Sequence, residues 1–143
     1  MRFPELDKSK KEFPKVADEV ARLEGYLDQV LARPILRPDH SYDHAAYDIV
    51  PILVAKALGV DEGFALLLLR LAEEAGVIAH RYDVYCPNTQ QLIAKFTSKN
   101  ELPLEIVCPF ESRVVHTIEE YFVEVVFNFT RQFALEHGLA VSM

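Results

Sequence analysis

The stretch that decides the fold runs from Ala45 to Pro87 and reads AAYDIVPILVAKALGVDEGFALLLLRLAEEAGVIAHRYDVYCP. Apolar residues recur at helical spacing on both sides of a turn at residues 59–62, which predicts two helices, the second ending at about Ala75. Gly76 is suited to end that helix, because glycine readily adopts the left-handed conformation that often follows a helix. Residues 78–86 then read as a strand. The order is therefore helix, turn, helix and strand.

This order, with a leucine-rich second helix that ends in EEAGVI and leads into a charged strand, resembles a winged helix-turn-helix over about residues 43–86. The resemblance implies an α+β protein whose helical N-terminal half forms the winged helix-turn-helix and is followed by a small β element. We expect three parts. They are a charged lead-in over residues 1–13, a winged-helix-like domain over 14–86, and an appended β-rich, ribbon-like element over 87–143.

Prolines and capping residues place the helices before the turn. Pro14 suits the first turn of a helix that runs to about Ala32 with one apolar stripe. Asp39 or Ser41 can cap the next helix, which we expect to continue to the turn at residues 59–62. Pro51 lies within that segment and predicts a kink or a helix boundary.

The C-terminal half is predicted to contain several short β segments. Residues 87–96 suit a short helix or a turn, and residues 102–108 suit a strand. Residues 121–129 are rich in Val, Phe and Tyr and alternate as a strand does. A helix over 117–137 also fits the spacing, so both interpretations of this segment stay open.

The composition favours a folded, acidic domain. The chain has 143 residues, half of them hydrophobic, and a formal net charge of −7. From Asp61 onward, twelve acidic residues outnumber six basic ones, whereas a phosphate-binding surface needs clustered Lys and Arg. The charge therefore argues against nucleic acid as a partner. No stretch approaches about 18 uninterrupted apolar residues and no signal peptide is visible, so we expect a cytoplasmic protein that does not engage a membrane.

The second helix of the pair supplies the expected binding surface. One of its faces is expected in the core and comprises Phe64, Leu67, Leu68 and Leu71. Leu66 and Leu69 are apolar beyond what that face needs, so they predict a surface for a protein partner or a second copy. Alternatively, they pack under the N-terminal helix or the C-terminal segment. The expected partner-binding residues are Leu66, Leu69, Arg70, Glu73 and Glu74.

DNA binding is the other use of such a helix, which would then present hydrogen-bond donors to base edges. Its outward residues include one arginine and three carboxylates, and the carboxylates would repel the duplex. The nucleic-acid contacts expected in that case are Arg70, His80 and Arg81.

Two Cys-Pro sites each follow a predicted strand, at Cys86-Pro-Asn-Thr89 and Cys108-Pro-Phe-Glu111. Together they resemble a zinc ribbon over about residues 86–111 in which each knuckle has lost its second cysteine. A structural zinc site needs four ligands, and threonine and glutamate are a poor and an unusual replacement. The resemblance implies a ribbon-like hairpin without metal, whose thiols are free and buried. A disulfide is disfavoured in a reducing compartment.

Two groups of residues are nevertheless candidate metal ligands. His40 and His44 are four residues apart and would share a helical face beside Asp43, which is a spacing that metals or acid–base chemistry can use. The same residues also suit a capped helix N-terminus. The second group comprises Cys86, Cys108, His80 and His116.

No HExxH, Walker, GxSxG or GxGxxG motif is present to indicate catalysis. We therefore expect a non-enzymatic protein–protein interaction or regulatory module without a cofactor, able to form a homodimer. A winged helix followed by a Cys-Pro hairpin resembles modules of prokaryotic regulatory and defence-associated proteins. The alternatives are a sequence-specific transcriptional regulator and a small metal-dependent enzyme that uses the cluster at residues 39–44.

Overall fold

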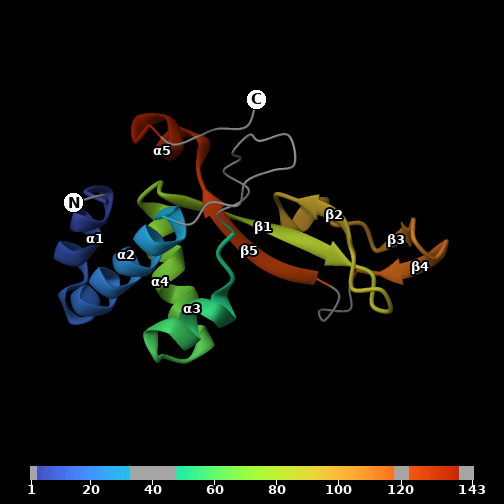
Figure 1. Ribbon diagram of the computed structural model, residues 1–143, viewed down its shortest axis with the longest axis horizontal. Coiled ribbons are helices and arrows are strands. Elements are labelled where there is room, and N and C mark those ends of the chain that lie inside the picture. The colour runs from blue at the N-terminus through green and yellow to red at the C-terminus, as the bar shows by residue number, and fades with distance from the viewer. Residues whose placement is uncertain (1–2, 33–47, 118–122, 139–143) are drawn as a thin grey trace. The chain divides into compact units, whose positions relative to one another are not determined.

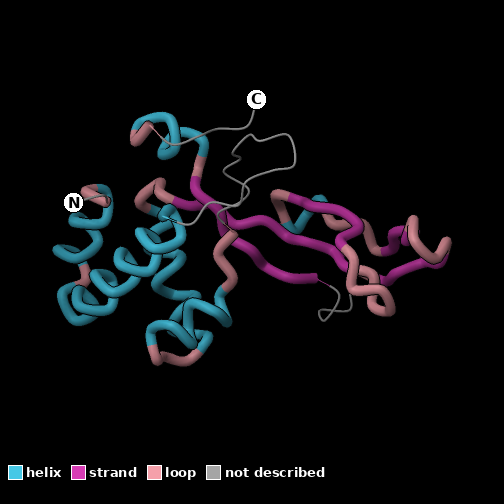
Figure 2. The backbone as a smooth tube through the Cα atoms, viewed as in Figure 1, coloured by secondary structure: helices cyan, strands magenta, loops and turns pink. Residues whose placement is uncertain are grey.

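The computed structural model describes residues 3–32, 48–117 and 123–138 of the chain (Figure 1). The helices are α1 (Glu5–Glu12), α2 (Ala17–Ala32), α3 (Pro51–Leu58), α4 (Glu62–Glu74) and α5 (Arg131–Glu136). The strands are β1 (Ile78–Tyr85), β2 (Leu92–Phe96), β3 (Glu105–Cys108), β4 (Arg113–His116) and β5 (Val123–Phe129). Helices α1 to α4 precede the strands and α5 follows β5; Figure 2 colours the helices cyan and the strands magenta, and the expected α+β class is confirmed.

The strands belong to two antiparallel sheets. One sheet has the order β2-β1-β5, and the other is the hairpin of β3 and β4. The chain divides into two compact units. We call them the helical unit, comprising Met1–Ala79 and Phe127–Met143, and the β unit, comprising His80–Val126. Both dividing points fall inside strands, because β1 and β5 each run through a boundary.

In the helical unit, the buried apolar side chains of α2 lie along one side of the helix, as the sequence predicts. A short 3-10 helix (Pro14–Val16) leads into α2, so Pro14 begins the helical segment at the expected position. The fully or almost fully buried apolar residues of α2 are Val20, Leu23, Leu27 and Leu31. Their spacing of three or four residues keeps them on one side of the helix, where they exclude water.

Glycine, proline and aspartate fix the ends of α3 and α4. Pro51 is the first residue of α3, so the helix-boundary interpretation of Pro51 is confirmed. Gly59 follows α3 with a φ of 68°, a conformation that costs glycine little. The Asp61 carboxylate accepts a hydrogen bond from the Phe64 amide at 2.7 Å and caps α4. Gly76, with a φ of 84°, ends this region as predicted.

The expectation of a helix continuing up to Pro51 is wrong for residues 48–50. Ile49 forms an isolated antiparallel bridge with Phe127, and the two residues exchange N–H···O bonds of 2.8 Å in both directions. Pairing with the end of β5 satisfies the backbone of Ile49 without a helix. The proposed caps, Asp39 and Ser41, lie outside the described residues.

The charged lead-in is not simply a solvated extension, because residues 5–12 form α1. Phe3 and Leu6 are buried. The Phe3 ring stacks on that of Phe133 at a centroid distance of 5.6 Å, and Lys10 pairs with Glu24 of α2. Hydrogen bonding to Glu24 raises the pKa of Lys10. Two buried apolar residues and one ion pair thus dock a segment that reads as polar in the sequence.

The C-terminal half is more strand-rich than expected. Residues 92–96 form β2, so the prediction of a helix there is wrong, although a turn at residues 87–89 fits the alternative. The strand expected at 102–108 is found as the shorter β3. Strand β5 confirms the strand interpretation of 121–129 for residues 123–129, and α5 follows it. The sequence analysis did not predict β4.

Candidate functional site

The β3–β4 hairpin presents two faces with opposite character. Ile106 lies opposite Val115 across the hairpin, and Val107 lies opposite Val114. Because successive side chains of a strand point to opposite faces, this register separates the two pairs. We call the face with Ile106 and Val115 the inner face and the other the outer face.

The inner face anchors the hairpin. Cys108 and Val115 are buried in one apolar cluster with Cys86, which follows β1. Ile93 of β2 and Ile106 of β3 pack against this cluster and are partly buried. A two-stranded hairpin is marginally stable by itself, so this packing is what holds β3 and β4 in place.

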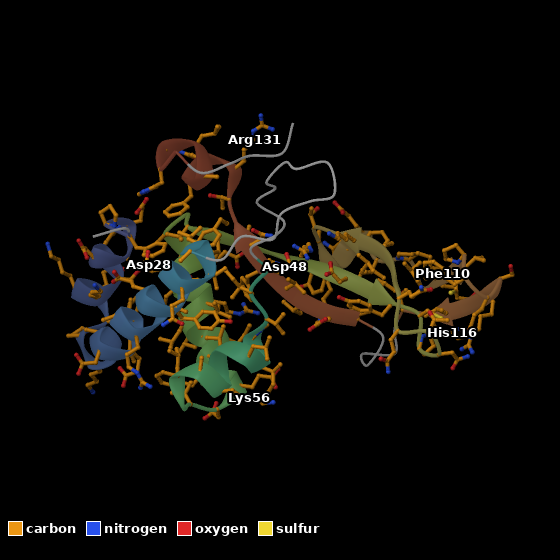
Figure 3. All side chains as sticks on the ribbon, viewed as in Figure 1. Asp28, Asp48, Lys56, Phe110, His116 and Arg131 are labelled. Atoms are coloured by element: carbon orange, nitrogen blue, oxygen red, sulfur yellow. The ribbon has the colours of Figure 1, made fainter. Side chains whose placement is uncertain are left out.

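The outer face and the two ends of the hairpin expose large apolar side chains. We call these residues the hairpin patch, and their exposed fractions are Leu104 71%, Val107 62%, Phe110 51% and Val114 45%. Leu104 precedes β3, and Phe110 lies in the turn between β3 and β4. Figure 3 labels Phe110 and, at the end of β4, His116. Exposed apolar residues concentrated on one small element are typical of an interaction surface.

Charged residues accompany the hairpin patch. The Glu105 carboxylate lies 3.4 Å from His116 Nδ1, and the Glu111 carboxylate lies 3.6 Å from Arg113 Nε. Asn88 donates a hydrogen bond of 3.2 Å to Glu111. An apolar centre with a polar rim is the usual composition of a protein–protein contact surface.

The surface predicted on α4 is only partly exposed. Leu69 is completely buried and Leu66 is half-buried, whereas Leu67 is 49% exposed. Of the expected core face, Leu68 and Leu71 are buried and Phe64 is half-buried, whereas the prediction that Leu67 is buried is wrong. Ala65 and Ala72 are buried with Leu68 and Leu69, and their small side chains permit close helix packing on that side. The placement of Leu69 in a contact surface is overturned by its burial.

The charged residues of the α4 surface are largely where the sequence puts them. Arg70 and Glu74 are exposed, and Glu73 is half-buried. Arg70 thus remains accessible to a partner. Glu74 and the exposed Glu62 lie on the same helix, and both would repel a phosphate backbone.

Arg81 is committed to a neighbouring carboxylate. Its Nε donates to Asp83 Oδ1 at 2.8 Å and its Nη2 donates to Asp83 Oδ2 at 3.1 Å. Asp83 is 2% exposed, so this two-pronged pair compensates a buried charge. His80 packs its ring edge-on against Tyr82 at a centroid distance of 5.4 Å. Neither Arg81 nor His80 is therefore presented in the manner that a DNA contact requires.

Sequence reasoning missed a polar face on β1. Arg81, Asp83 and Tyr85 alternate along the strand and so point to the same side. Burial, followed by the charges of Asp83 and Glu124 and a hydrogen bond to Glu124, raises the pKa of Tyr85 to about 12. The Tyr85 hydroxyl therefore stays protonated and donates to Glu124. The spacing of Arg, Asp and Tyr two residues apart was the available signal.

The candidate metal ligands do not assemble in the part of the chain that is described. Within those residues, no group of three or more His, Cys, Asp or Glu side chains could hold a metal ion. His116 pairs with Glu105 on the outer face, away from Cys108 on the inner face, so the structure does not bring His116 together with Cys108 as a Cys2His2 site would require. His40, Asp43 and His44 lie outside the described residues.

The two cysteines, by contrast, are brought together. Both are buried and carry free thiols, and they belong to the same apolar cluster. Thr89 and Glu111 each lie three residues after a cysteine in the two Cys-Pro segments. The inner face of the hairpin thus contains a pair of thiols without a complete set of metal ligands.

Comparison with known proteins identifies no relative. No protein-family model, no curated protein and no solved structure matches the chain. Among the described helices, none is both long and apolar enough to cross a membrane. A functional assignment therefore depends on the geometry of the residues themselves.

Proposed function

We propose that this chain is a non-enzymatic protein-interaction module with a regulatory role, and that it contacts its partner through the hairpin patch. The observation that carries the proposal is the exposure of Leu104, Val107, Phe110 and Val114 on one hairpin whose other face is anchored in a core. Burying these side chains against a partner would remove apolar area from water, which is the main favourable term in protein association.

The proposed occupant is a different protein that surrounds apolar side chains with basic residues. The chain has a net charge of −7, and its residues from Asp61 onward are acidic by twelve to six. Two copies of this chain would repel one another, whereas a basic partner would be attracted and would bind faster. A homodimer is therefore an outcome that the experiment must distinguish.

The helical unit is proposed to be a winged-helix scaffold. Its element order supports this reading: Ile49 pairs with Phe127, α3 and α4 follow as a helix pair, and β1 comes directly afterwards. The β unit is then an insertion between β1 and β5, in the position of an enlarged wing. In this arrangement the partner surface belongs to the insertion and not to the second helix of the pair.

The test compares two variants that introduce charge at exposed apolar positions. Val107→Glu/Val114→Lys removes the apolar pair of the outer face, and its opposite charges across the strands keep the hairpin compatible with pairing. Leu67→Glu is the matched control on α4, where the new carboxylate lies one helical turn from Arg70. Partners are captured from the source cells with the wild-type chain, produced in pure form and titrated against all three proteins.

We expect the hairpin variant to lose at least about tenfold in affinity, since every 1.4 kcal/mol is a factor of ten and two valines bury more than that. Leu67→Glu should bind as the wild type does, and hydrogen exchange should show protection over residues 104–116 in the complex. Equal binding by the hairpin variant, or a loss confined to Leu67→Glu, would move the surface to α4. If the wild type forms dimers and the hairpin variant is monomeric, the hairpin patch is a surface for self-association instead.

DNA binding is tested in the same preparation. Random duplex DNA at low salt should leave the mass and mobility of the protein unchanged. Binding that declines steeply with salt and is weakened by Arg70→Ala would overturn the proposal in favour of a transcriptional regulator.

A further inference from the structure

The two Cys-Pro segments adopt the same uncommon turn. The Gln90 amide donates to the Cys86 carbonyl at 2.8 Å, and the Ser112 amide donates to the Cys108 carbonyl at the same distance. Gln90 has a φ of 59° and Ser112 a φ of 54°, a region that residues other than glycine rarely occupy. Two strained turns of one design, at the ends of two strands, thus each present a cysteine at their first position.

The turns direct hydrogen-bond donors at one sulfur. Cys86 Sγ accepts from the hydroxyl and the amide of Thr89, from the Asn88 amide and from the thiol of Cys108. Burial raises the pKa of the Cys86 thiol, but these donors outweigh burial, and the pKa is held below its usual value. These donors ease the ionisation of Cys86 relative to a thiol buried without them, and the Cys108 thiol lies in the same apolar cluster.

We propose that Cys86 and Cys108 form an oxidisable thiol pair, in which Cys86 attacks a peroxide and Cys108 closes an intramolecular disulfide. This inference is independent of the proposed function, because it concerns the inner face of the hairpin. Two thiolates alone do not complete a tetrahedral zinc site, whereas they are sufficient for a disulfide. Thr89 supplies a donor to the sulfur where a metal site would need another ligand.

The chemistry balances with hydrogen peroxide as the oxidant. The Cys86 thiolate attacks one peroxide oxygen, the O–O bond breaks and hydroxide leaves, so that sulfur loses two electrons and becomes a sulfenic acid. The Cys108 sulfur then attacks Cys86 Sγ, its proton is transferred to the departing oxygen, and the S–O bond breaks to release water. The products are one disulfide and two molecules of water.

Because both cysteines are buried, we expect them to react with a small oxidant in preference to a bulky one. Both cysteines are 0% exposed, and buried thiols generally react slowly with bulky reagents. Hydrogen peroxide is only slightly larger than water, so burial hinders its access to the thiols less than that of a larger oxidant. An aromatic disulfide reagent should react far more slowly with the native protein than with the protein in urea.

The experiment treats the purified, metal-free chain with hydrogen peroxide and follows free thiols and intact mass. The wild type should lose both thiols together and lose the mass of two hydrogen atoms, with peptide mapping joining Cys86 to Cys108. Cys108→Ser should accumulate a sulfenic acid at Cys86 that dimedone traps. In Cys86→Ser, Cys108 should oxidise about tenfold more slowly, because the hydrogen-bond donors of Thr89 and Asn88 are directed at the Cys86 sulfur.

Thr89→Val keeps both sulfurs and removes one donor from an exposed position, so it tests the site in a chain that should fold. It should shift the pH dependence of Cys86 oxidation to higher pH, which a purely structural role of Thr89 would not do. Intermolecular disulfides, equal rates for the two single-cysteine variants, or a wild type that oxidises only in urea would each overturn the proposal. Circular dichroism of every variant separates these results from unfolding.

Discussion

Helix α4 and the β3–β4 hairpin both contain apolar residues that are buried and apolar residues that are exposed, but the cause of this division differs between them. On α4, four consecutive leucines surround the helix, and rotation by one residue decides which are buried; Leu68 and Leu69 are buried and Leu67 is left exposed. The hairpin has no such freedom, because its register fixes Val107 and Val114 on the face opposite to Val115. Apolar residues on both faces of a two-stranded hairpin cannot all be buried by the same core.

The largest expected effect comes from replacing a buried and an exposed leucine of α4 by alanine and comparing the free energies of unfolding. Leu69→Ala should lower the free energy of unfolding by about 2–5 kcal/mol, because it leaves a cavity in a packed core. Leu67→Ala should change it by about 0.5 kcal/mol or less, as for other exposed positions. Urea denaturation monitored by circular dichroism measures both. Similar losses in the two variants would show that the buried phase of α4 has been misassigned.

The same contrast applies to the hairpin, with a smaller expected effect. Val115→Ala removes two methyl groups from the inner cluster and should cost roughly 2 kcal/mol. Val114→Ala, its neighbour on the outer face, should cost less than about 1 kcal/mol in the isolated protein. Hydrogen exchange of the β3 and β4 amides reports on this hairpin directly. If Val114→Ala proved the more damaging change, the outer face would be packed and unavailable to a partner.

The smallest expected effect on stability concerns the ionisation of Tyr85. Strand alternation places Tyr85 on the same side of β1 as Arg81 and Asp83, which residues two apart on a helix would not share. An unfolded tyrosine ionises near pH 10, whereas the pKa of Tyr85 is about 12 in the fold. The folded chain therefore retains the proton longer, and the stability due to Tyr85 is intact below pH 10 and declines between pH 10 and 12. Replacement by phenylalanine should abolish the decline in stability between pH 10 and 12.

Ultraviolet difference titration of the wild type against Tyr85→Phe isolates this ionisation. Glu124→Gln, which removes the negative charge but keeps a hydrogen-bond acceptor, should bring the pKa of Tyr85 closer to its ordinary value. An unchanged titration in Glu124→Gln would leave burial and the charge of Asp83 as the causes of the raised pKa and would show that Glu124 does not act on Tyr85.

Much of the fold was predictable because strong local signals punctuate the chain. Pro14, Pro51, Gly59 and Gly76 set boundaries that the structure keeps. Which leucines of α4 are buried was only partly predictable, since a run of leucines fits two helix faces equally well; Leu68 and Leu71 were predicted correctly and Leu67 was not. Strand β2 was missed because residues 92–96 read LIAKF, in which apolar residues do not alternate with polar ones.

The candidate sites were predictable to different degrees. The repeated Cys-Pro motif correctly indicated two cysteines that the fold places in one buried cluster. The hydrogen bonds donated to the Cys86 sulfur come from a turn geometry that the composition does not reveal. The hairpin patch was not predicted, because β4 was not recognised and exposure depends on its pairing with β3. The docking of α1 likewise depends on Phe3 meeting Phe133, which is a contact between residues far apart in sequence.

The boundaries between the two units have an evolutionary consequence. Residues 80–126 depart from β1 and return through β5, which are neighbouring strands of one sheet, and the Thr130 amide donates to the Val77 carbonyl at 3.0 Å on the helical side of both crossings. A segment whose two ends are held this closely can be exchanged or lengthened with little loss of loop entropy. We therefore expect residues 80–126 to tolerate changes of length and sequence during evolution while the fold of the helical unit is preserved.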